Sequence, residues 1–273
     1  MKIKGKTALI TGAARGIGQA TAFEFAKAGA DIVGVDLHLP DMQATADTVQ
    51  KLNRKFTGLA CDITNDSATR KMLQHAMDSN GGFDVLVNNA AVMASGPFLE
   101  QDFNVWRRTI ETNLTALMAL THAALPHLIK KESAHIVNVA SIAGKFGTEG
   151  VVAYAASKHG VVGFSSALRF ELQKTNVGVS WICPSQAATR MGEGVEHTFL
   201  TPVVQPKDVA KAVRKAVENN SPEVYVPRSQ RWLVSIIPSL APRFARWFSE
   251  WSKASQGWLQ ARKEIPTDKE RGA

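Results

Sequence analysis

The sequence predicts an α/β protein with one parallel sheet, and two observations support this fold class. Short apolar runs alternate with longer segments of helical periodicity from Thr7 to Val226. The runs are nearly continuous in apolar character, which is typical of strands that helices bury on both faces. Alternation of strands and helices produces βαβ units and therefore parallel strands. Because no linker or repeat interrupts the pattern, we expect a single doubly wound domain.

The elements follow one another in a regular order. The first apolar run, TALIT, predicts a buried strand, and the segment behind it places Phe23 and Ala26 at helical spacing. DIVGVD, FDVLVN, HIVNVAS and VGVSWIC are later runs of the same kind. The expected strands are Thr7–Thr11, Asp31–Asp36, Phe56–Asp62, Phe83–Asn88, His135–Ser141, Val177–Cys183 and Glu223–Val226. The expected helices are Gly16–Ala28, Ser67–Met77, Val105–Lys130, Tyr154–Lys174 and Lys207–Asn219.

Composition excludes several other classes of protein. Of 273 residues, 45% are hydrophobic and 21% are charged, which excludes a disordered, collagen-like or coiled-coil chain. The two cysteines cannot form a disulfide framework, and we expect Cys61 and Cys183 to be reduced core residues of a cytoplasmic protein. The sequence contains neither a signal peptide nor an apolar run of transmembrane length.

The positive charge is concentrated at the C-terminal end. Residues 228–273 contain nine basic and four acidic residues, a net charge of +5 out of the total of +8. Four of the six tryptophans lie there too. We therefore divide the chain into a catalytic domain, residues 1–227, and a basic, aromatic extension, residues 228–273. Such a composition suggests an anionic surface as a partner.

The extension contains an amphipathic pattern. In a helix over Pro242–Arg262, the side chains of Phe244, Trp247, Phe248, Trp251, Trp258 and Leu259 share one face, with Arg243, Arg246 and Lys253 opposite. One interpretation is a helix packed over the substrate pocket or on a neighbouring subunit. The other is an interfacial anchor at the inner face of a membrane.

A glycine cluster suited to phosphate binding follows the first strand. Gly12 permits a sharp turn, Gly16 permits the backbone to approach a pyrophosphate, and Gly18 permits close packing of helix and strand. The N-terminus of the following helix then offers free N–H groups to the phosphates. An ordinary turn is the alternative, but the strand before and the helix after favour a Rossmann-like dinucleotide site.

The residue at the end of the second strand bears on the choice of cofactor. Asp36 lies eighteen residues after Gly18, where a carboxylate can accept both ribose hydroxyls and repel a 2′-phosphate. Leu37 follows it, whereas a basic residue there would suit NADP. Arg15 favours NADP instead, because its side chain could bind a 2′-phosphate. The balance favours NAD.

Tyr154 and Lys158 form a candidate acid–base pair. Their spacing places them on one helix face, and an ammonium near a phenol lowers its pKa from about 10. A snorkelling lysine in an amphipathic helix is the alternative. Ser141, at the carboxyl end of the preceding strand, lies where ligands bind in open parallel sheets. The three residues are suited to interconverting a carbonyl and an alcohol.

Taken together, these motifs resemble those of the short-chain dehydrogenase/reductase family from Lys4 to Val226. The matches extend to Asp62 at the adenine, Asn88-Asn89-Ala90 after the fourth strand, Asn113, and Thr189 at the nicotinamide carboxamide. The resemblance implies cofactor contacts from Gly12, Arg15, Gly16, Ile17, Gly18, Asp36, Leu37, Cys61, Asp62, Ile63, Asn89, Ala90, Ala91, Tyr154, Lys158, Pro184 and Thr189. Ala91, and Ser185 after Pro184, depart from the family pattern, which usually has glycine at both positions.

The resemblance also implies a role for each catalytic residue. Tyr154 exchanges a proton with the substrate oxygen, and Lys158 lowers its pKa and holds the nicotinamide ribose. Ser141 binds the substrate oxygen, and Asn113 positions a water that links Lys158 to solvent. In the family, the helices corresponding to Val105–Lys130 and Tyr154–Lys174 form a dimer interface, so a homodimer or homotetramer is expected. The apolar stripe Phe103, Trp106, Ile110, Leu114 and Leu117 is either core or subunit interface.

We therefore expect an NAD-dependent oxidoreductase for an apolar secondary alcohol or ketone of steroid-, retinoid- or long-chain type. The apolar residues after Thr189 (Met191, Val195, Phe199 and Leu200) are the expected substrate lid. Three alternatives remain open: an NADPH-dependent 3-oxoacyl reductase, a catalytically silent nucleotide-binding protein, and a membrane-peripheral protein. The sequence lacks the Gly-rich C-terminal strand of acyl-carrier reductases. It indicates neither a metal site nor nucleic-acid binding.

Overall fold

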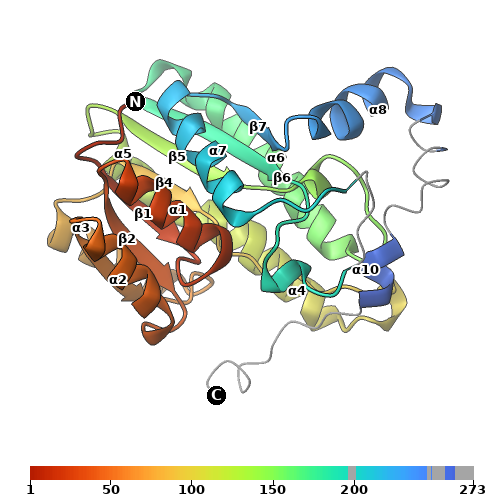
Figure 1. Cartoon of the computed structure of the whole chain (residues 1–273), viewed down its shortest axis with the longest axis horizontal. Helices are drawn as coiled ribbons and strands as arrows, with labels where there is room; N and C mark the ends of the chain where they lie inside the picture. Colours follow the sequence, from red (N-terminus) through yellow and green to blue (C-terminus); the bar gives the residue numbers. More distant parts are fainter. Residues whose placement is uncertain (196–200, 245–246, 248–255, 262–273) are drawn as a thin grey trace.

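The computed structural model describes residues 1–195, 201–244, 247 and 256–261. Its centre is a seven-stranded sheet in the order β3-β2-β1-β4-β5-β6-β7, with every neighbouring pair parallel (Figure 1). The strands are β1 Thr7–Thr11, β2 Asp31–Asp36, β3 Phe56–Ala60, β4 Val85–Asn88, β5 Ala134–Val139, β6 Val177–Pro184 and β7 Glu223–Val226. The predicted fold class and strand order along the chain are confirmed.

Several strand ends differ from the prediction for a physical reason. The third strand was expected to continue to Asp62 but ends at Ala60. Its neighbour β2 ends at Asp36, whose carbonyl accepts the N–H of Cys61, so no further ladder partner exists. The fifth strand likewise ends at Val139, two residues before Ser141. Cys61, Asp62 and Ser141 therefore lie in loops at the carboxyl edge of the sheet.

Helices cover both faces of the sheet, and alternate strand residues point to opposite faces. Ala8 and Ile10 of β1 pack with α1 (Gly16–Lys27) and α7 (Pro206–Asn219), whereas Leu9 packs with α3 (Asp66–Asn80) and α5 (Ala116–Leu128). The α2 helix (Gln43–Lys51) lies beside α1, and α6 (Val152–Glu171) covers the second face. The two apolar clusters together form the core (Figure 1). The sequence pattern did not predict α2.

The long helix predicted over Val105–Lys130 is divided in the structure. It consists of α4 (Phe103–Ile110), a π-helical turn η3 (Glu111–Thr115) and α5. A π-turn inserts an extra residue, and such turns are frequent at functional sites. The turn also breaks the apolar stripe, because Phe103 is 66% exposed whereas Leu117 is buried.

Beyond β7 the chain leaves the sheet. A π-helical turn η7 (Trp232–Ile236) leads into the short helix α8 (Ile237–Leu240), and α10 (Gln256–Ala261) lies on the opposite side of the same end of the molecule (Figure 1). A Cβ on Gly150 would lie 2.7 Å from the backbone nitrogen of Leu259, so α10 packs directly on the loop before α6. Most of the helix predicted over Pro242–Arg262 falls outside the described residues. In the part that is described, no helix is long and apolar enough to cross a membrane.

Candidate active site

A large cavity of about 2090 Å³ lies at the carboxyl ends of the strands. Its walls come from the loops after β1, β2, β3, β4, β5 and β6, which lie far apart in the sequence. The strand order reverses direction between β1 and β4, and open parallel sheets bind ligands at such a switch point. All of the predicted catalytic and cofactor residues line this cavity except Gly18 and Asn113, which lie just behind its wall.

The glycine loop is shaped by close backbone contacts. Gly12 has a φ of +67°, and a Cβ there would lie 2.8 Å from the side-chain amide nitrogen of Asn89. A Cβ on Gly18 would lie only 2.0 Å from the Gly12 carbonyl oxygen, so no other residue fits without moving the loop. This packing brings the first turn of α1, with Arg15, Gly16 and Ile17, to the cavity wall.

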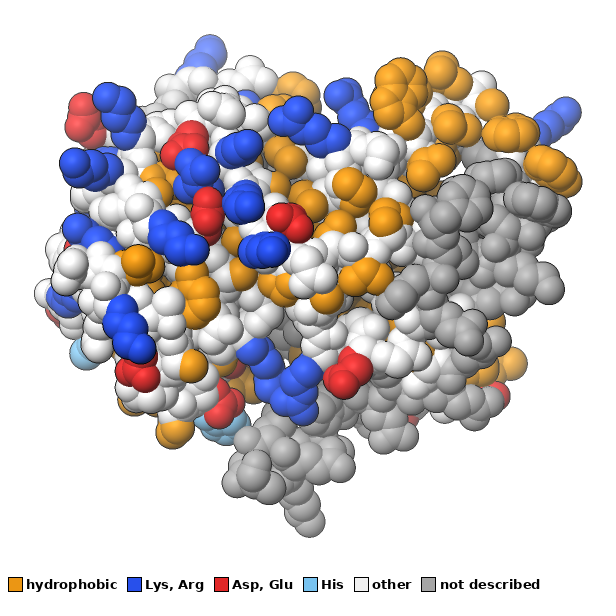
Figure 2. All heavy atoms as spheres, in the orientation of Figure 1, with side chains coloured by type: hydrophobic (Ala, Val, Ile, Leu, Met, Phe, Trp, Pro, Cys, Tyr) orange, Lys and Arg blue, Asp and Glu red, His pale blue; other side chains and the backbone are white. Residues whose placement is uncertain are grey.

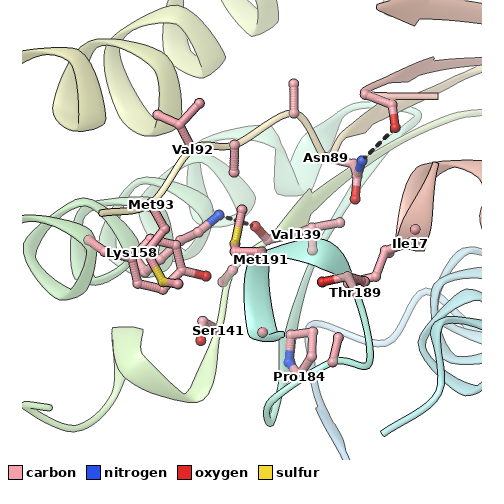
Figure 3. A pocket seen from close by; sticks show the side chains of 18 of the residues that line it. Ile17, Asn89, Val92, Met93, Val139, Ser141, Lys158, Pro184, Thr189 and Met191 are labelled. Carbon is pink, nitrogen blue, oxygen red and sulfur yellow. Dashed lines mark hydrogen bonds between the residues drawn. The ribbon is translucent and has the colours of Figure 1, made fainter. Parts of the chain in front are cut away.

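Thr11 joins the loop to the next strand in a way that sequence analysis missed. Its hydroxyl accepts the backbone N–H groups of both Asn89 and Ala90 at 3.0 Å. The Asn89 side chain donates in return to the carbonyls of Thr11 and Gly12 (Figure 3). These bonds hold the loops after β1 and β4 together at the switch point, with Ala90 and Ala91 on the cavity wall.

Asp36 supports the glycine loop as well as lining the cavity. One carboxylate oxygen accepts the N–H of Ala14 at 2.9 Å, and the other accepts the N–H of Leu37. Arg15 and Leu37 line the cavity beside it. Because each carboxylate oxygen can accept a further bond, the geometry leaves acceptor capacity toward the cavity.

The loop after β3 forms a second polar rim. One Asp62 oxygen accepts from both the backbone N–H and the hydroxyl of Thr64, which fixes the loop's turn. Cys61 and Ile63 flank it and also line the cavity. Both cysteines are free and buried as expected, and burial raises the pKa of the Cys61 thiol. Cys61 therefore presents a neutral, apolar surface.

Ser141, Tyr154 and Lys158 all line the cavity, and Figure 3 shows Ser141 and Lys158 on its wall. The Ser141 hydroxyl accepts the N–H of Ala143, and its proximity lowers the pKa of the Tyr154 phenol. Lys158 lies one helical turn further along α6, with its Nζ 5.6 Å from the centre of the tyrosine ring. Its ammonium donates to the Val139 carbonyl at 2.8 Å. Three polar groups thus line the same part of the cavity.

Burial dominates the ionisation of this pair. It raises the pKa of Tyr154 to about 12, an effect that the hydrogen bond from Ser141 partly offsets. Burial lowers the pKa of Lys158 to about 8. The expected role of Lys158, to lower the pKa of the phenol, stays a prediction; its ammonium donates to the Val139 carbonyl and lies 5.6 Å from the centre of the tyrosine ring. The pair therefore holds a protonated phenol at neutral pH.

Asn113 lies behind the pair, in the π-turn η3. Its side chain accepts the N–H of Val92 at 2.8 Å, and donates to the Val92 carbonyl and to the hydroxyl of Ser157. Ser157 donates in turn to the Tyr154 carbonyl. The asparagine thus joins the loop after β4 to the first turns of α6. Ser157 was not predicted; a hydroxyl beside Lys158 on a buried helix face was the available signal.

The far end of the cavity is largely apolar. Residues of the C-terminal extension contribute there together with the loop after β4, the segment between β5 and α6, and the loop after β6, so one wall comes from the extension. The apolar residues are Met93, Ile142, Phe146, Val151, Met191, Leu233, Val234, Ile237, Phe244 and Trp258. Of the predicted lid, Met191 lines the cavity and Val195 is buried; Phe199 and Leu200 fall outside the described residues.

The two departures from the family pattern have different surroundings. The hydroxyl of Ser185 donates to the Pro202 carbonyl at 2.7 Å, which ties the end of β6 to the segment that leads into α7. Pro184 and Thr189 line the cavity on either side of it, and the Thr189 methyl group faces Gly16. Ala91 adds a single methyl group to the wall.

Two of the histidines, His127 and His135, make structural hydrogen bonds. His127 accepts the N–H of Phe83, which fixes the loop before β4, and His135 is bonded to Ser180 within the sheet. Burial lowers the pKa of His135 to about 3. In the described residues, no group of three or more His, Cys, Asp or Glu side chains could hold a metal ion.

Comparison with known proteins places the chain in a family. The ketoacyl reductase HetN of Nostoc is 34% identical, covering 90% of each sequence. The mouse 17-beta-hydroxysteroid dehydrogenase 13 is 30% identical over 89% of this chain and 80% of that protein. The crystal structure of carveol dehydrogenase from Mycobacterium avium in complex with NAD superposes with a TM-score of 0.76, 27% identity, and coverage of 82% and 97%. The short chain dehydrogenase model matches residues 6–199, and the chain belongs to the short-chain dehydrogenase/reductase family of oxidoreductases.

Proposed function

We propose that this oxidoreductase uses NAD(H) to interconvert an apolar secondary alcohol and its ketone. The observation that carries the proposal is the shape of the cavity, which extends from Asp36 past Ser141, Tyr154 and Lys158 to the apolar wall at Trp258. One end suits a dinucleotide, the centre suits proton transfer, and the other end suits an apolar molecule.

The residues present fit a nicotinamide dinucleotide. The glycines let the loop pack closely against Asn89 and Thr189, and the first turn of α1, which has no side-chain cap, lies at the cavity wall with its N–H groups available to phosphate. Gly12 to Gly18 would hold the pyrophosphate, Asp36 the adenosine ribose, and Asp62 the adenine. Asn89, Ala90, Thr189 and Lys158 would hold the nicotinamide end. The cofactor, when bound, supplies hydride transfer to or from the substrate carbon.

The protein's own residues handle the proton. In the reduction direction, the Tyr154 hydroxyl donates its proton to the substrate oxygen, while Ser141 holds that oxygen by a hydrogen bond. Lys158 then stabilises the phenolate, because a positively charged ammonium near the phenol favours its deprotonated, negatively charged form. Asn113 fixes the backbone around this pair and positions a water through which Lys158 reaches solvent. The complete set argues against the catalytically silent alternative.

The preference for NAD over NADP rests on Asp36. A 2′-phosphate on the ribose would meet this carboxylate at close range, and like charges disfavour such a pair. The cofactor-bound structures of carveol dehydrogenase and of a short chain dehydrogenase from Mycobacterium paratuberculosis contain NAD. Both are 27% identical to this chain.

An NADPH-dependent 3-oxoacyl reductase is the second candidate, and two observations favour it. HetN is named a ketoacyl reductase, and the 3-oxoacyl-[acyl-carrier-protein] reductase of Vibrio cholerae is 33% identical over 78% of this chain. Arg15 also lines the cavity beside Asp36, where it could pair with a 2′-phosphate. The two candidates differ in which residue faces the ribose and in what fills the apolar end.

Exposed apolar side chains suggest a homodimer or homotetramer. Phe103 of α4, Met118 of α5 and Phe170 of α6 are all exposed, and α4 packs against α6. Large apolar side chains exposed on neighbouring helices are typical of interaction sites. The helices concerned are those that form dimer interfaces by resemblance to the family.

A substrate and cofactor panel tests the proposal. Purified protein would be assayed with NAD and NADP against steroids, retinoids, long-chain secondary alcohols and, in the reverse direction, 3-oxoacyl thioesters. We expect turnover of an apolar secondary alcohol with a higher kcat/KM for NAD. A higher kcat/KM for NADPH with a 3-oxoacyl thioester would replace this proposal with the second candidate.

A further inference from the structure

The segment from Arg228 to Trp247, here called the docking segment, exposes large apolar side chains at one end of the molecule. Trp232 is 61% exposed, Leu240 81%, Phe244 51% and Trp247 57%. Figure 2 shows hydrophobic side chains gathered over the α8 end of the molecule, where Figure 1 places the helix away from the sheet. So concentrated an apolar surface is seldom left in water.

The other side of the docking segment faces the protein interior. Val234 is buried in an apolar cluster with Trp181, Cys183 and Tyr225 of the sheet. Leu233, Val234 and Ile237 line the cavity. The segment is therefore held by the core, and its exposed residues lie on the outer side of a cavity wall.

All of the charged side chains of the docking segment are positive. Arg228, Arg231 and Arg243 are exposed, Arg246 adds a fourth positive charge in the sequence, and residues 228–247 contain neither Asp nor Glu. Another exposed apolar group, Phe98, Leu99 and Phe103, is interspersed with Glu100 and Asp102. Only the docking segment combines exposed tryptophans with unopposed arginines among the described residues.

This combination favours a lipid surface over a second copy of the chain. Tryptophan and arginine are enriched where helices lie in the headgroup region of a bilayer, and anionic lipids attract each basic side chain. In a two-fold dimer the same patch meets itself, so the arginines of one copy would face those of the other. Charge complementarity therefore points to an anionic membrane.

We propose that the docking segment binds the surface of an anionic lipid bilayer and places the apolar end of the cavity next to the lipid. Binding needs only the exposed apolar residues and the arginines. Delivery of substrate from lipid to cavity rests, in addition, on the proposed function, because it requires an apolar substrate.

Vesicle flotation with the full chain tests the binding directly. The protein would be mixed with phosphatidylcholine vesicles with and without phosphatidylserine, at low and high salt. We expect flotation with the anionic vesicles at low salt, and loss of it with neutral lipid or high salt. Trp232→Ser with Leu240→Ser should weaken binding about tenfold or more, and each arginine replaced by Gln about fivefold.

Leu99→Ser is the matched control, since Leu99 is 95% exposed before α4 and lies outside the docking segment. It should float like the wild type. Oligomer size would be measured for every variant by light scattering. Absence of flotation by the wild type at low salt overturns the proposal, as does equal flotation of the control and the double variant. A change of oligomer size on Trp232→Ser with Leu240→Ser would assign the patch to subunit contact instead.

The readout separates this proposal from the proposed function. Flotation does not depend on cofactor or turnover, so an inactive protein that floats leaves the docking proposal standing. Trp232 and Leu240 do not line the cavity. Their replacement should therefore leave kcat/KM unchanged for a short, water-soluble alcohol and lower the rate only for a substrate presented in anionic vesicles. An equal loss with both substrates would overturn the delivery step.

Discussion

The two ends of the cavity are built in different ways. The end toward Asp36 is formed by short, local stretches of backbone, in which glycines and three hydrogen-bonded loops set the shape. The end toward Trp258 is formed by side chains from segments as far apart as Met93 and the C-terminal extension. Between them, α6 presents Tyr154 and Lys158 to both ends.

The difference indicates where specificity can vary. The glycine loop tolerates almost no change, because a Cβ at Gly12 or Gly18 would lie within 3 Å of atoms that are already packed there. A wall of apolar side chains can change residue by residue while the fold is kept, since its members share no hydrogen-bond network. We expect substitutions at the first end to affect every reaction of the enzyme, and substitutions at the second to affect only the choice of substrate.

The largest effect on activity is expected at Tyr154, which lies between the two ends of the cavity. Tyr154→Phe removes only the transferable proton, so kcat should fall by about 10²–10⁴-fold while the affinity for NADH stays within about twofold. Steady-state kinetics and NADH fluorescence titration would measure the two. Tyr225→Phe removes the chain's other phenol, which is buried away from the cavity, and should keep wild-type kcat. Equal kcat values for the two variants would exclude Tyr154 as the proton donor.

Adding a single methyl group tests the packing of the glycine loop at the Asp36 end of the cavity. Gly18→Ala would place a Cβ 2.0 Å from the Gly12 carbonyl oxygen, so the loop must move. Overpacking of this kind costs about 1–3 kcal/mol, and we expect NADH to bind up to about a hundredfold more weakly. Gly163→Ala, in α6 with open space around it, should instead raise stability by about 0.4–1 kcal/mol. Unchanged NADH affinity in Gly18→Ala would contradict the proposed role of the glycine loop.

Asp36→Ala tests a side chain that supports the backbone end. It removes both the proposed ribose contact and the bond to the Ala14 N–H, so kcat/KM with NAD should fall about tenfold. Activity with NADP should rise, because the repelling charge is gone. Asp41→Ala, at a second carboxylate on the cavity wall, should leave the ratio of kcat/KM for the two cofactors unchanged. A wild-type enzyme that already favours NADP would refute the role of Asp36 and favour Arg15.

Local sequence patterns predicted most of the residues at the Asp36 end of the cavity and few of those at the Trp258 end. The glycine loop, Asp36 and the Tyr154–Lys158 pair were visible because their chemistry requires particular residues at short, fixed spacings. The hydroxyl of Thr11 was missed, because its two N–H donors lie in the loop after β4, which is distant in sequence. The π-turn that carries Asn113 was also missed, since a helical periodicity does not show a one-residue insertion.

The contact of α10 with Gly150 could not be predicted from the sequence, since it depends on where a chain of more than a hundred residues returns. The aromatic pattern of the extension was clear, but it was compatible both with a helix packed over the pocket or a neighbouring subunit and with a membrane anchor. In the described residues the extension does face both ways: Trp258 lines the cavity and Trp232 is exposed. The amphipathic pattern gave the composition of the faces but could not say what each one contacts.

The smallest expected effect is at Trp258, and it tests the side-chain end. Trp258→Ala opens the apolar wall without touching the glycine loop or Tyr154, so KM for a bulky apolar alcohol should rise about fivefold, as lost apolar contact predicts. The kcat for a short secondary alcohol and the affinity for NADH should stay at wild-type values. Trp232→Ala changes the same residue type outside the cavity and should leave both KM values unchanged in the absence of lipid. If Trp258→Ala weakened the binding of NADH as much as that of the bulky alcohol, the two ends of the cavity would not be independent. The extension would then stabilise the whole site rather than select its substrate.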